Sequence, residues 1–372
     1  MPKNLLLLGA GHAHAEVLRR FARQPLKDVE ITLVSPQAFA PYTGMAPGIV
    51  SGRYALKDAT IDAGALSEKA GAKVAYAKAE AIDPTARTVR LDDGSSLPYD
   101  LLSINVGGAV IPPFEQVKGG PAVLSVKPVE PFLEALDASL ARARNPKIIV
   151  AGGGYGGVEL AAALKARGAG VALATGPDGL APDAPAKARI KIKRLLQKRL
   201  VHILDGRSVC GAATDKDGGP VALLDDGDAI PCSHIVLATG VSPPSLLKSV
   251  PHLTDETGFL RVNAFLQCAN DPSIFAAGDC AALRHIDTGA PAQKAGVYAV
   301  REGPVLAENL RAALTGERLR YYEPQGHALA ILSFHPDGAV LVRGRRARAG
   351  RIVGMAKSLI DRRFINRYRV AP

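Results

Sequence analysis

The chain has 372 residues, which is enough for two or three domains that each have their own core. It contains 47% hydrophobic, 22% charged and only 5% aromatic residues and no Trp, a composition that fits a globular protein and argues against aromatic platforms for carbohydrate or single-stranded nucleic acid. The net charge is +11, and +9 of it falls between Arg343 and Arg369, where ten Lys/Arg face one acid, so the basic charge is local.

The cysteine pattern and the N-terminus indicate a cytoplasmic protein. The four cysteines form no close pair, so neither a redox disulfide nor a zinc site is predicted, and a reducing compartment is expected. The apolar run Met1–Leu8 is too short for a secretion signal and ends in a glycine turn. The chain has no apolar stretch of about eighteen residues, so no transmembrane helix is expected.

The first third of the chain alternates strands and helices. The predicted order is a strand, a glycine turn, a helix, a strand, a hairpin with its turn, and an apolar strand: Asn4–Leu8, Gly9–His14, His14–Arg23, Glu30–Val34, Ala81–Leu91 with Asp92–Gly94, and Leu101–Val106. The middle third repeats this plan: Lys147–Ala151, Gly152–Gly157, Val158–Ala166, Val171–Ala174, a hairpin with Asp225–Gly227, and Ile235–Ala238. Such alternation predicts parallel sheets with crossover helices, and its repetition predicts two Rossmann-like α/β domains.

The second copy of the plan is predicted to be inserted into the first domain. Pro- and Gly-rich linkers flank it at Pro112–Pro121 and Ser242–Pro244, and the apolar strand that ends near Asp279 needs a partner sheet. The predicted domains are 1–115 with 241–315, then 116–240, then a C-terminal region, 316–372. In that region we expect strands at Ala328–Phe334, Val340–Arg343 and Arg351–Met355, followed by a basic helix.

The two glycine turns indicate two dinucleotide sites. In the first turn, Gly9 permits the tight turn, and Gly11 lets a pyrophosphate approach the N-terminus of a helix. His14 stands where the third glycine is normal, whereas the second turn is complete with Gly152, Gly154 and Gly157. The alternative is a structural turn without a ligand, but the placement between an apolar strand and a helix favours binding.

Each copy lacks the acid that usually holds the adenosine ribose. The second strand of each unit ends at Ser35 or Thr175 instead, and a hydroxyl can make one of those bonds without charge assistance. The choice between NADH and NADPH therefore stays open, and so does nicotinamide binding itself.

Several other residues are candidates for flavin chemistry. Asp279 can accept a hydrogen bond from a ribitol hydroxyl of FAD, or it can cap a helix over Cys280–Arg284. Lys294, near the N-terminus of a helix, can add positive charge at the flavin pyrimidine, or it can be a solvated lysine. Glu159 either complements a helix dipole or lies where nicotinamide meets flavin. The loop Phe39–Gly48 either lines the flavin ring or is an inert turn.

Two further features have competing interpretations. His12 and His14 have no evident third ligand, so packing or phosphate contact is expected and no metal site is predicted. At the C-terminus, apolar residues recur at helical spacing between basic ones: Met355, Leu359, Ile360, Phe364 and Tyr368. This basic amphipathic helix can lie on an anionic membrane, or its apolar side can pack on the protein or on a second subunit.

These motifs together resemble the pyridine nucleotide–disulfide oxidoreductase superfamily. The resemblance rests on the two glycine turns and on Asn105–Gly107, Ala238–Gly240, Ala277–Asp279 and Gln293–Ala295. It is nearer to single-subunit NADH:quinone dehydrogenases and sulfide:quinone reductases. It is nearest to the flavoprotein module fused ahead of selenide,water dikinases, which shares the GxGHxH turn, the Pro41–Gly48 loop, Lys127-Pro128 and the ending Asp361–Phe364.

The resemblance implies FAD in the first domain and NAD(P)H over the second. The expected catalytic residues are Glu159 and Lys294. The expected cofactor-binding residues are Gly9, Ala10, Gly11, His12, Ala13, Ser35, Pro41, Tyr42, Gly107, Gly152, Gly154, Tyr155, Gly157, Gly240, Gly278, Asp279 and Ala295.

The function expected from these features is an FAD-dependent NAD(P)H dehydrogenase with a quinone-like acceptor, cytoplasmic or peripheral on the inner face of a membrane. No cysteine precedes Cys210, which argues against sulfide oxidation and thiol–disulfide exchange. The alternatives are a flavoprotein of selenium metabolism and a non-catalytic nucleotide-binding protein. A nucleic-acid partner is not expected, because the basic charge is confined to one tail.

Overall fold

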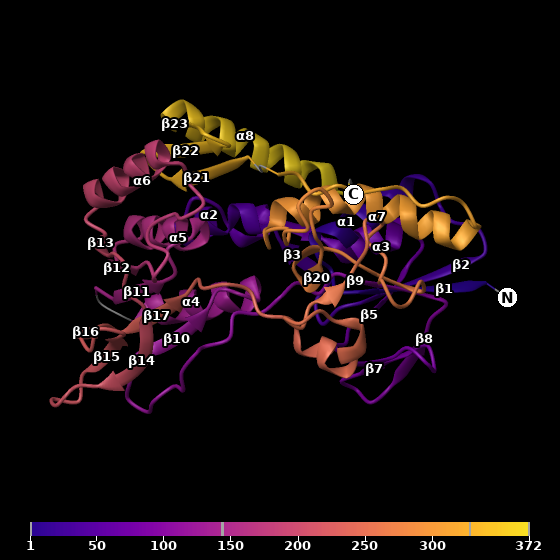
Figure 1. The fold of residues 1–372 in the computed structure, drawn as a ribbon, viewed down its shortest axis with the longest axis horizontal. Coiled ribbons are helices and arrows are strands. Elements are labelled where there is room, and N and C mark those ends of the chain that lie inside the picture. Colours follow the sequence, from indigo (N-terminus) through magenta and orange to yellow (C-terminus); the bar gives the residue numbers. More distant parts are fainter. Residues whose placement is uncertain (1, 143–144, 327–328, 371–372) are drawn as a thin grey trace.

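The structure is a computed structural model that describes residues 2–142, 145–326 and 329–370. It is an α/β protein with two five-stranded parallel sheets, which confirms the predicted fold class. The two sheets belong to two units that lie side by side, and the C-terminal segment lies across both of them (Figure 1).

The first sheet combines strands that precede the second sheet in the sequence with one strand, β19, that follows it. Its order is β19-β9-β1-β2-β5, with bounds Ile274–Ala276, Leu101–Ile104, Lys3–Leu8, Val29–Val34 and Lys73–Ala75. The apolar strand before Asp279 thus pairs with β9 in this sheet. Leu5–Leu8 are at most 2% exposed, because layers cover both faces of this sheet.

Helices and a small antiparallel sheet make those layers. The helices are α1 (His12–Arg23), α3 (Ala63–Lys69) and α7 (Gly296–Thr315), and the antiparallel strands are β6 (Ala79–Asp83), β7 (Thr88–Leu91) and β8 (Ser96–Pro98). Figure 1 shows the helices and the antiparallel strands on opposite sides of the parallel sheet. The predicted turn at Asp92–Gly94 is present, since Gly94 N–H donates to Leu91 O.

The second sheet has the same arrangement of its four other strands, but its edge strand β10 (Ala122–Ser125) precedes them in the sequence, whereas β19 follows the other strands of the first sheet. The order of the second sheet is β10-β17-β11-β12-β13, with bounds Ala122–Ser125, His234–Leu237, Lys147–Ala151, Gly170–Ala174 and His202–Leu204. Around it lie α4 (Val129–Arg142), α5 (Tyr155–Ala166), α6 (Ala186–Lys198) and the antiparallel strands β14 (Val209–Thr214), β15 (Pro220–Leu224) and β16 (Ala229–Pro231). In both sheets the order reverses beside the glycine turn, which is where open α/β sheets bind ligands.

The C-terminal region differs from the prediction at one element. The strands are β21 (Ala330–Phe334), β22 (Gly338–Arg343) and β23 (Arg346–Gly350), and helix α8 (Arg351–Tyr368) follows. The predicted strand Arg351–Met355 is therefore wrong: these residues form the first turns of α8. The reason is tertiary, because Gly354 packs directly on Gly338, with its Cβ position 2.9 Å from the Gly338 Cα atom. Ala328, the predicted start of the first strand, lies outside the described residues.

Short elements complete the fold. They are β3 (Phe39–Pro41), α2 (Ala46–Val50), β4 (Thr60–Asp62), β18 (Leu260–Arg261) and β20 (Ala281–Ala282). Strands β3 and β4 pair antiparallel and hold the loop after the second strand of the first sheet.

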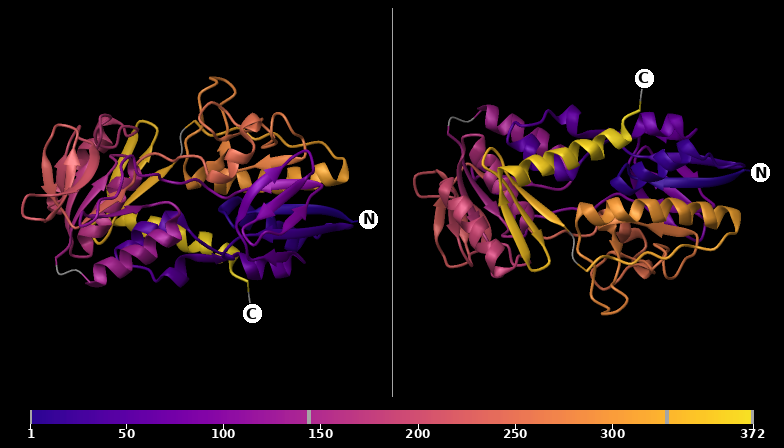
Figure 2. Two further views of the ribbon diagram at one scale, coloured as in Figure 1. Left: turned by 90° about the horizontal axis from the view of Figure 1, so that it is seen from below. Right: turned by 90° about the horizontal axis from the view of Figure 1, so that it is seen from above.

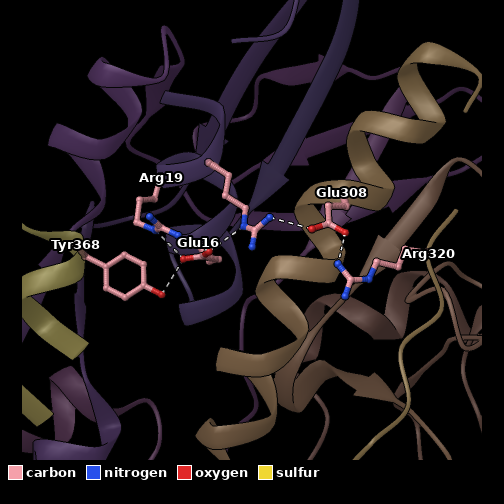
Figure 3. Close-up of polar contacts among 6 residues, drawn as sticks. Glu16, Arg19, Glu308, Arg320 and Tyr368 are labelled. Carbon is pink, nitrogen blue, oxygen red and sulfur yellow. Dashed lines mark hydrogen bonds and ion pairs between the residues drawn. The ribbon is translucent and has the colours of Figure 1, made fainter. Parts of the chain in front are cut away.

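Helix α8 is attached to the first unit through a buried carboxylate. Tyr368 Oη donates to Glu16 Oε2 of α1 (3.1 Å), and Glu16 also accepts from Arg19 and Arg20 (Figure 3). Burial alone would raise the pKa of Glu16, but these hydrogen bonds lower it. Arg20 also donates a hydrogen bond to Glu308 of α7, so one polar network joins α1, α7 and α8. Seen from above, α8 runs from the second unit to the first (Figure 2).

Candidate functional site

The first glycine turn is packed too closely for any side chain. A Cβ atom at Gly9 would lie 2.7 Å from Asn105 O, and one at Gly11 would lie 2.2 Å from Asn105 Oδ1. Gly9 also has φ +87°, a conformation that favours glycine. The strand end, the turn and α1 are therefore held in one compact arrangement around Asn105.

Asn105 organises this turn, a role that the sequence motif did not reveal. Its Oδ1 accepts from the N–H groups of Ala13 (3.1 Å) and His14 (3.3 Å), and its Nδ2 donates to Ala277 O (2.7 Å). One amide, 3% exposed, thus joins α1 to the ends of β9 and β19. Since Asn105 satisfies the second and third amides of the helix, the backbone N–H groups of Gly11 and His12 remain for an anion.

The two histidines of the turn have different roles. His14 takes the place of the third glycine: its Nδ1 lies 2.7 Å from Gly9 O, and its Nε2 lies 2.8 Å from Ser103 Oγ. His12 packs edge-on against Tyr42, with ring centroids 5.6 Å apart, and its buried Nε2 has no hydrogen-bond partner among the described residues. Burial lowers the pKa of each to about 4, so both are neutral at pH 7. The described residues contain no group of His, Cys, Asp and Glu suited to a metal.

Asp279 lies at the same edge of the first sheet and pairs with a lysine. Lys127, which precedes a cis-proline bond, forms an ion pair with Asp279, and both charges act on the pKa of His12. The turn before Asp279 is held by Glu302 of α7, whose Oε2 accepts from Gly278 N–H at 2.5 Å. A three-residue turn, Gly278–Cys280, follows β19, so the alternative helix at Cys280–Arg284 does not form. Ser35 is buried, and its hydroxyl donates to Gln37 O (2.6 Å).

Lys294 lies just before α7 and is mostly buried. Its Nζ donates to Ala281 O and lies 3.9 Å from the ring centroid of Phe259. Burial lowers its pKa, while Cys280 and Asp279 oppose that effect. The solvated lysine of the alternative reading is therefore not found. The helix begins after Ala295, where a Cβ at Gly296 would lie 2.6 Å from Thr43 Oγ1, so the loop Phe39–Gly48 touches the start of α7.

The loop Phe39–Gly48 is covered by the C-terminal helix. Tyr42 stacks on Phe364 with ring centroids 4.2 Å apart. Lys357 Nζ donates to Gly44 O (2.8 Å) and pairs with Asp361 (3.0 Å), a pair that is mostly buried. Thus α8 covers this loop through Phe364 and Lys357.

The second glycine turn has the same close packing. Gly152 has φ +126°, and its Cβ position lies 2.4 Å from Ala238 O; that of Gly157 lies 1.8 Å from Gly152 O. Gly154 is the N-cap of α5, and Tyr155 is its first residue. Thr175 is buried, whereas Gly240, beyond β17, is exposed.

Glu159 contacts the C-terminal region. Its Oε1 accepts from Ser333 N–H of β21 (2.7 Å), and burial raises its pKa to about 7, opposed by Lys357. Glu159 therefore interacts with β21, and not only with the dipole of α5. The two predicted catalytic residues lie in different surroundings: Lys357, Asp361 and Tyr42 surround Glu159, whereas Cys280, Asp279 and Glu302 surround Lys294.

The cysteines form no disulfide among the described residues. All four are free thiols, and Cys280, next to Asp279, is fully buried and donates to Ala277 O. Burial raises its pKa to about 12, so it is not a thiolate nucleophile at neutral pH.

Two parallel sheets with glycine turns at equivalent edges define a two-nucleotide oxidoreductase fold. Residues 3–301 match the model of the pyridine nucleotide-disulphide oxidoreductase family, and the chain belongs to it. It is 30% identical over 286 residues to the ferredoxin–NAD(+) reductase component of the anthranilate 1,2-dioxygenase system of Burkholderia cepacia, covering 74% of this chain and 67% of that protein.

Solved structures share the fold over nearly the whole chain. The sulfide:quinone oxidoreductase of Aquifex aeolicus has a TM-score of 0.75 and 20% identity, covering 100% of this chain and 93% of that one. NDH2 of Plasmodium falciparum has a TM-score of 0.78 and 14% identity, covering 99% of this chain and 97% of that one. Two further structures of this fold are longer chains, of which this chain covers 62% and 63%.

Family members use FAD with NAD(P)H, and the residues of this chain fit FAD. The first turn leaves no room for a Cβ, the N–H groups of Gly11 and His12 are available, and the buried Nε2 of His12 has no partner in the described part of the chain. These groups suit a pyrophosphate, and Asp279 lies at the same sheet edge for a sugar hydroxyl. The protein is therefore a flavin- and NAD(P)H-dependent oxidoreductase.

Proposed function

We propose that this protein is an NAD(P)H dehydrogenase that delivers electrons to a quinone-like acceptor. The observation that carries the proposal is the position of the C-terminal region, which covers the Phe39–Gly48 loop through Lys357 and contacts Glu159 through Ser333. The likeness to a sulfide:quinone oxidoreductase and to NDH2 extends over this region, since it covers 99% or more of the chain. The buried, protonated Cys280 argues against a thiol-based acceptor.

The residues of the chain have separate tasks in this proposal. FAD, when bound, supplies the two-electron chemistry. The amides at the start of α1 bind its pyrophosphate, and Asp279 accepts from a sugar hydroxyl. Lys294 provides positive charge close to Asp279, while Glu159 orients the nicotinamide or holds a proton at the opposite cluster.

An anaerobic titration tests the proposal. The purified holoprotein should lose its visible flavin absorbance on addition of NADH or NADPH, and short-chain quinones should restore it faster than a [2Fe–2S] ferredoxin does. Glu159→Gln, which keeps an acceptor for Ser333 N–H, should slow the bleaching about 100-fold if Glu159 takes part in the reaction. Protein that cannot be loaded with FAD, or that prefers ferredoxin, would contradict the proposal.

We also propose that α8 attaches the protein to an anionic membrane. No helix among the described residues is long and apolar enough to span a bilayer. The structure divides the predicted apolar face in two: Phe364 and Tyr368 are buried, whereas Met355 is 70%, Leu359 58% and Ile360 48% exposed. Ile352, 82% exposed, extends this outer strip, and exposed arginines flank it. An apolar strip with basic flanks suits the headgroup region of an anionic bilayer.

Point variants test this attachment better than a truncation. Removing α8 would also remove the hydrogen bond of Tyr368 to Glu16 and that of Lys357 to Gly44. The variant Met355→Asp/Leu359→Asp should abolish binding to phosphatidylglycerol-containing vesicles, while Ile286→Asp, at a comparably exposed site outside α8, should not change it. Equal binding of all three proteins would contradict the attachment.

A further inference from the structure

The second nucleotide site has no acid at the end of β12, where this fold usually binds the adenosine ribose. Thr175 stands there, but its hydroxyl is used within the protein: Thr175 Oγ1 accepts from Gly206 N–H at 2.8 Å. The side chain is 4% exposed. Thr175 is thus committed to holding the end of β12 against the turn after β13.

The turn after β13 also carries Asp205, whose carboxylate lies beside Thr175, at the end of β12. Asp205 follows β13, which pairs with β12, so the two strands end at one edge of the sheet. Asp205 Oδ1 lies 3.4 Å from Thr175 Oγ1. β12 has no acid at its end, but Asp205 at the end of the neighbouring strand β13 places a carboxylate close to that position.

Asp205 is also close to the loop that packs against the second glycine turn. A Cβ at Gly179 would lie 3.7 Å from Asp205 Oδ1, and the carbonyl oxygen of Gly179 lies 2.4 Å from the Cβ position of Gly153. The loop after β12 thus links the turn Gly152–Gly157 directly to this carboxylate. A nucleotide with its pyrophosphate at that turn places its adenosine half toward the ends of β12 and β13.

We infer that Asp205 binds the adenosine ribose of the nicotinamide nucleotide and selects NADH over NADPH. An ionised carboxylate accepts hydrogen bonds from the 2′- and 3′-hydroxyls of NADH, whereas it repels the 2′-phosphate of NADPH. Lys193 pairs with Asp205 at 3.3 Å, but both side chains are about half exposed, so this ion pair contributes little and can open.

The inference rests on the proposed function only in requiring that a nicotinamide nucleotide binds. The test compares the holoprotein with Asp205→Asn, using NAD+ and NADP+ as probes because they do not reduce the bound cofactor. Calorimetric titration should show about tenfold weaker binding of NAD+ to Asp205→Asn, with NADP+ binding unchanged or tighter. The control Asp178→Asn removes the same charge from the exposed loop after β12 and should change neither Kd by more than about twofold.

The possible results distinguish a failure of the proposed function from a failure of the role inferred for Asp205. Wild-type protein that binds neither probe would contradict the proposed function. Binding of NAD+ that is unaffected by Asp205→Asn, or equally weakened by Asp178→Asn, would overturn the role of Asp205. A loss of NADP+ binding in Lys193→Gln, with Asp205→Asn unchanged, would also overturn it, since a phosphate-binding lysine would then set the coenzyme preference.

Discussion

We predict that the buried carboxylate of Glu302 makes the free energy of unfolding depend on pH. Glu302 is 4% exposed on α7, and its Oε2 accepts from Gly278 N–H at the turn that carries Asp279. Burial raises its pKa from the ordinary value of 4.5 to about 7; the Gly278 hydrogen bond and Lys294 oppose this, and Asp279 adds to it. The folded protein therefore retains a proton between pH 4.5 and 7 that the unfolded chain releases.

The sign of the effect follows from this difference in proton binding. Where the folded state binds more protons, the free energy of unfolding falls as the pH rises. The Glu302 contribution should thus be lost between pH 4.5 and about 7, and the difference between these pKa values corresponds to about 3 kcal/mol as an upper estimate. Glu302→Gln keeps a hydrogen-bond acceptor for Gly278 N–H but cannot ionise.

Urea unfolding at pH 5 and pH 8 measures this difference. Because the chain has no Trp, far-UV circular dichroism is the suitable signal, with FAD in excess throughout. Glu302→Gln should match the wild type at pH 5 and gain stability, by up to about 3 kcal/mol, at pH 8. The exposed control Glu317→Gln should show no such gain. A stability difference between Glu302→Gln and the wild type that is the same at both pH values would refute the reasoning.

Two further predictions concern the glycine turns. Asn105→Ala leaves two amides and the Ala277 carbonyl without their partner, so urea unfolding should show a loss of about 3 kcal/mol; an unchanged midpoint would argue against the bridging role of Asn105. Gly157→Ala places a Cβ 1.8 Å from Gly152 O and should abolish NAD+ binding, measured by calorimetry, while FAD is retained. Gly156→Ala, where a Cβ meets open space, is the matched control and should bind NAD+ normally.

Local sequence was sufficient for the repeated units. Each glycine turn lies between an apolar strand and a helix, and the predicted strand Lys147–Ala151 agrees with β11 at both ends. Helix starts were less accurate, since α1 begins at His12 and α5 at Tyr155, two and three residues before the predicted starts. These residues are Gly, Ala and aromatic types whose helical state is decided by the turn geometry, which apolar spacing does not report.

The functional partners could not be read from the sequence because they are distant along the chain. Lys127 meets Asp279 from the segment between β10 and α4 of the second unit, and Asn105 reaches α1 from the end of β9. Both residues lie in motifs that are recognisable in the sequence, but neither motif shows which distant group the side chain contacts. The role of each residue depends on which strand ends meet at one edge of the sheet, and the strand order is a property of the whole unit.

The C-terminal helix shows most clearly how tertiary packing changes a sequence interpretation. Helical spacing predicted an apolar face, and the competing interpretations were a membrane, the protein itself or a second subunit. The residues of that face are Met355, Leu359, Ile360, Phe364 and Tyr368. The structure assigns Phe364 and Tyr368 to the protein, since they pack near His12 and Glu16, and it leaves Met355 and Leu359 exposed. Lys357 of the same helix donates to Gly44 O, so α8 connects the outer strip to the loop beside His12. Vesicle binding should therefore change the rate of acceptor reduction, and Met355→Asp/Leu359→Asp should remove that change without altering the rate in solution.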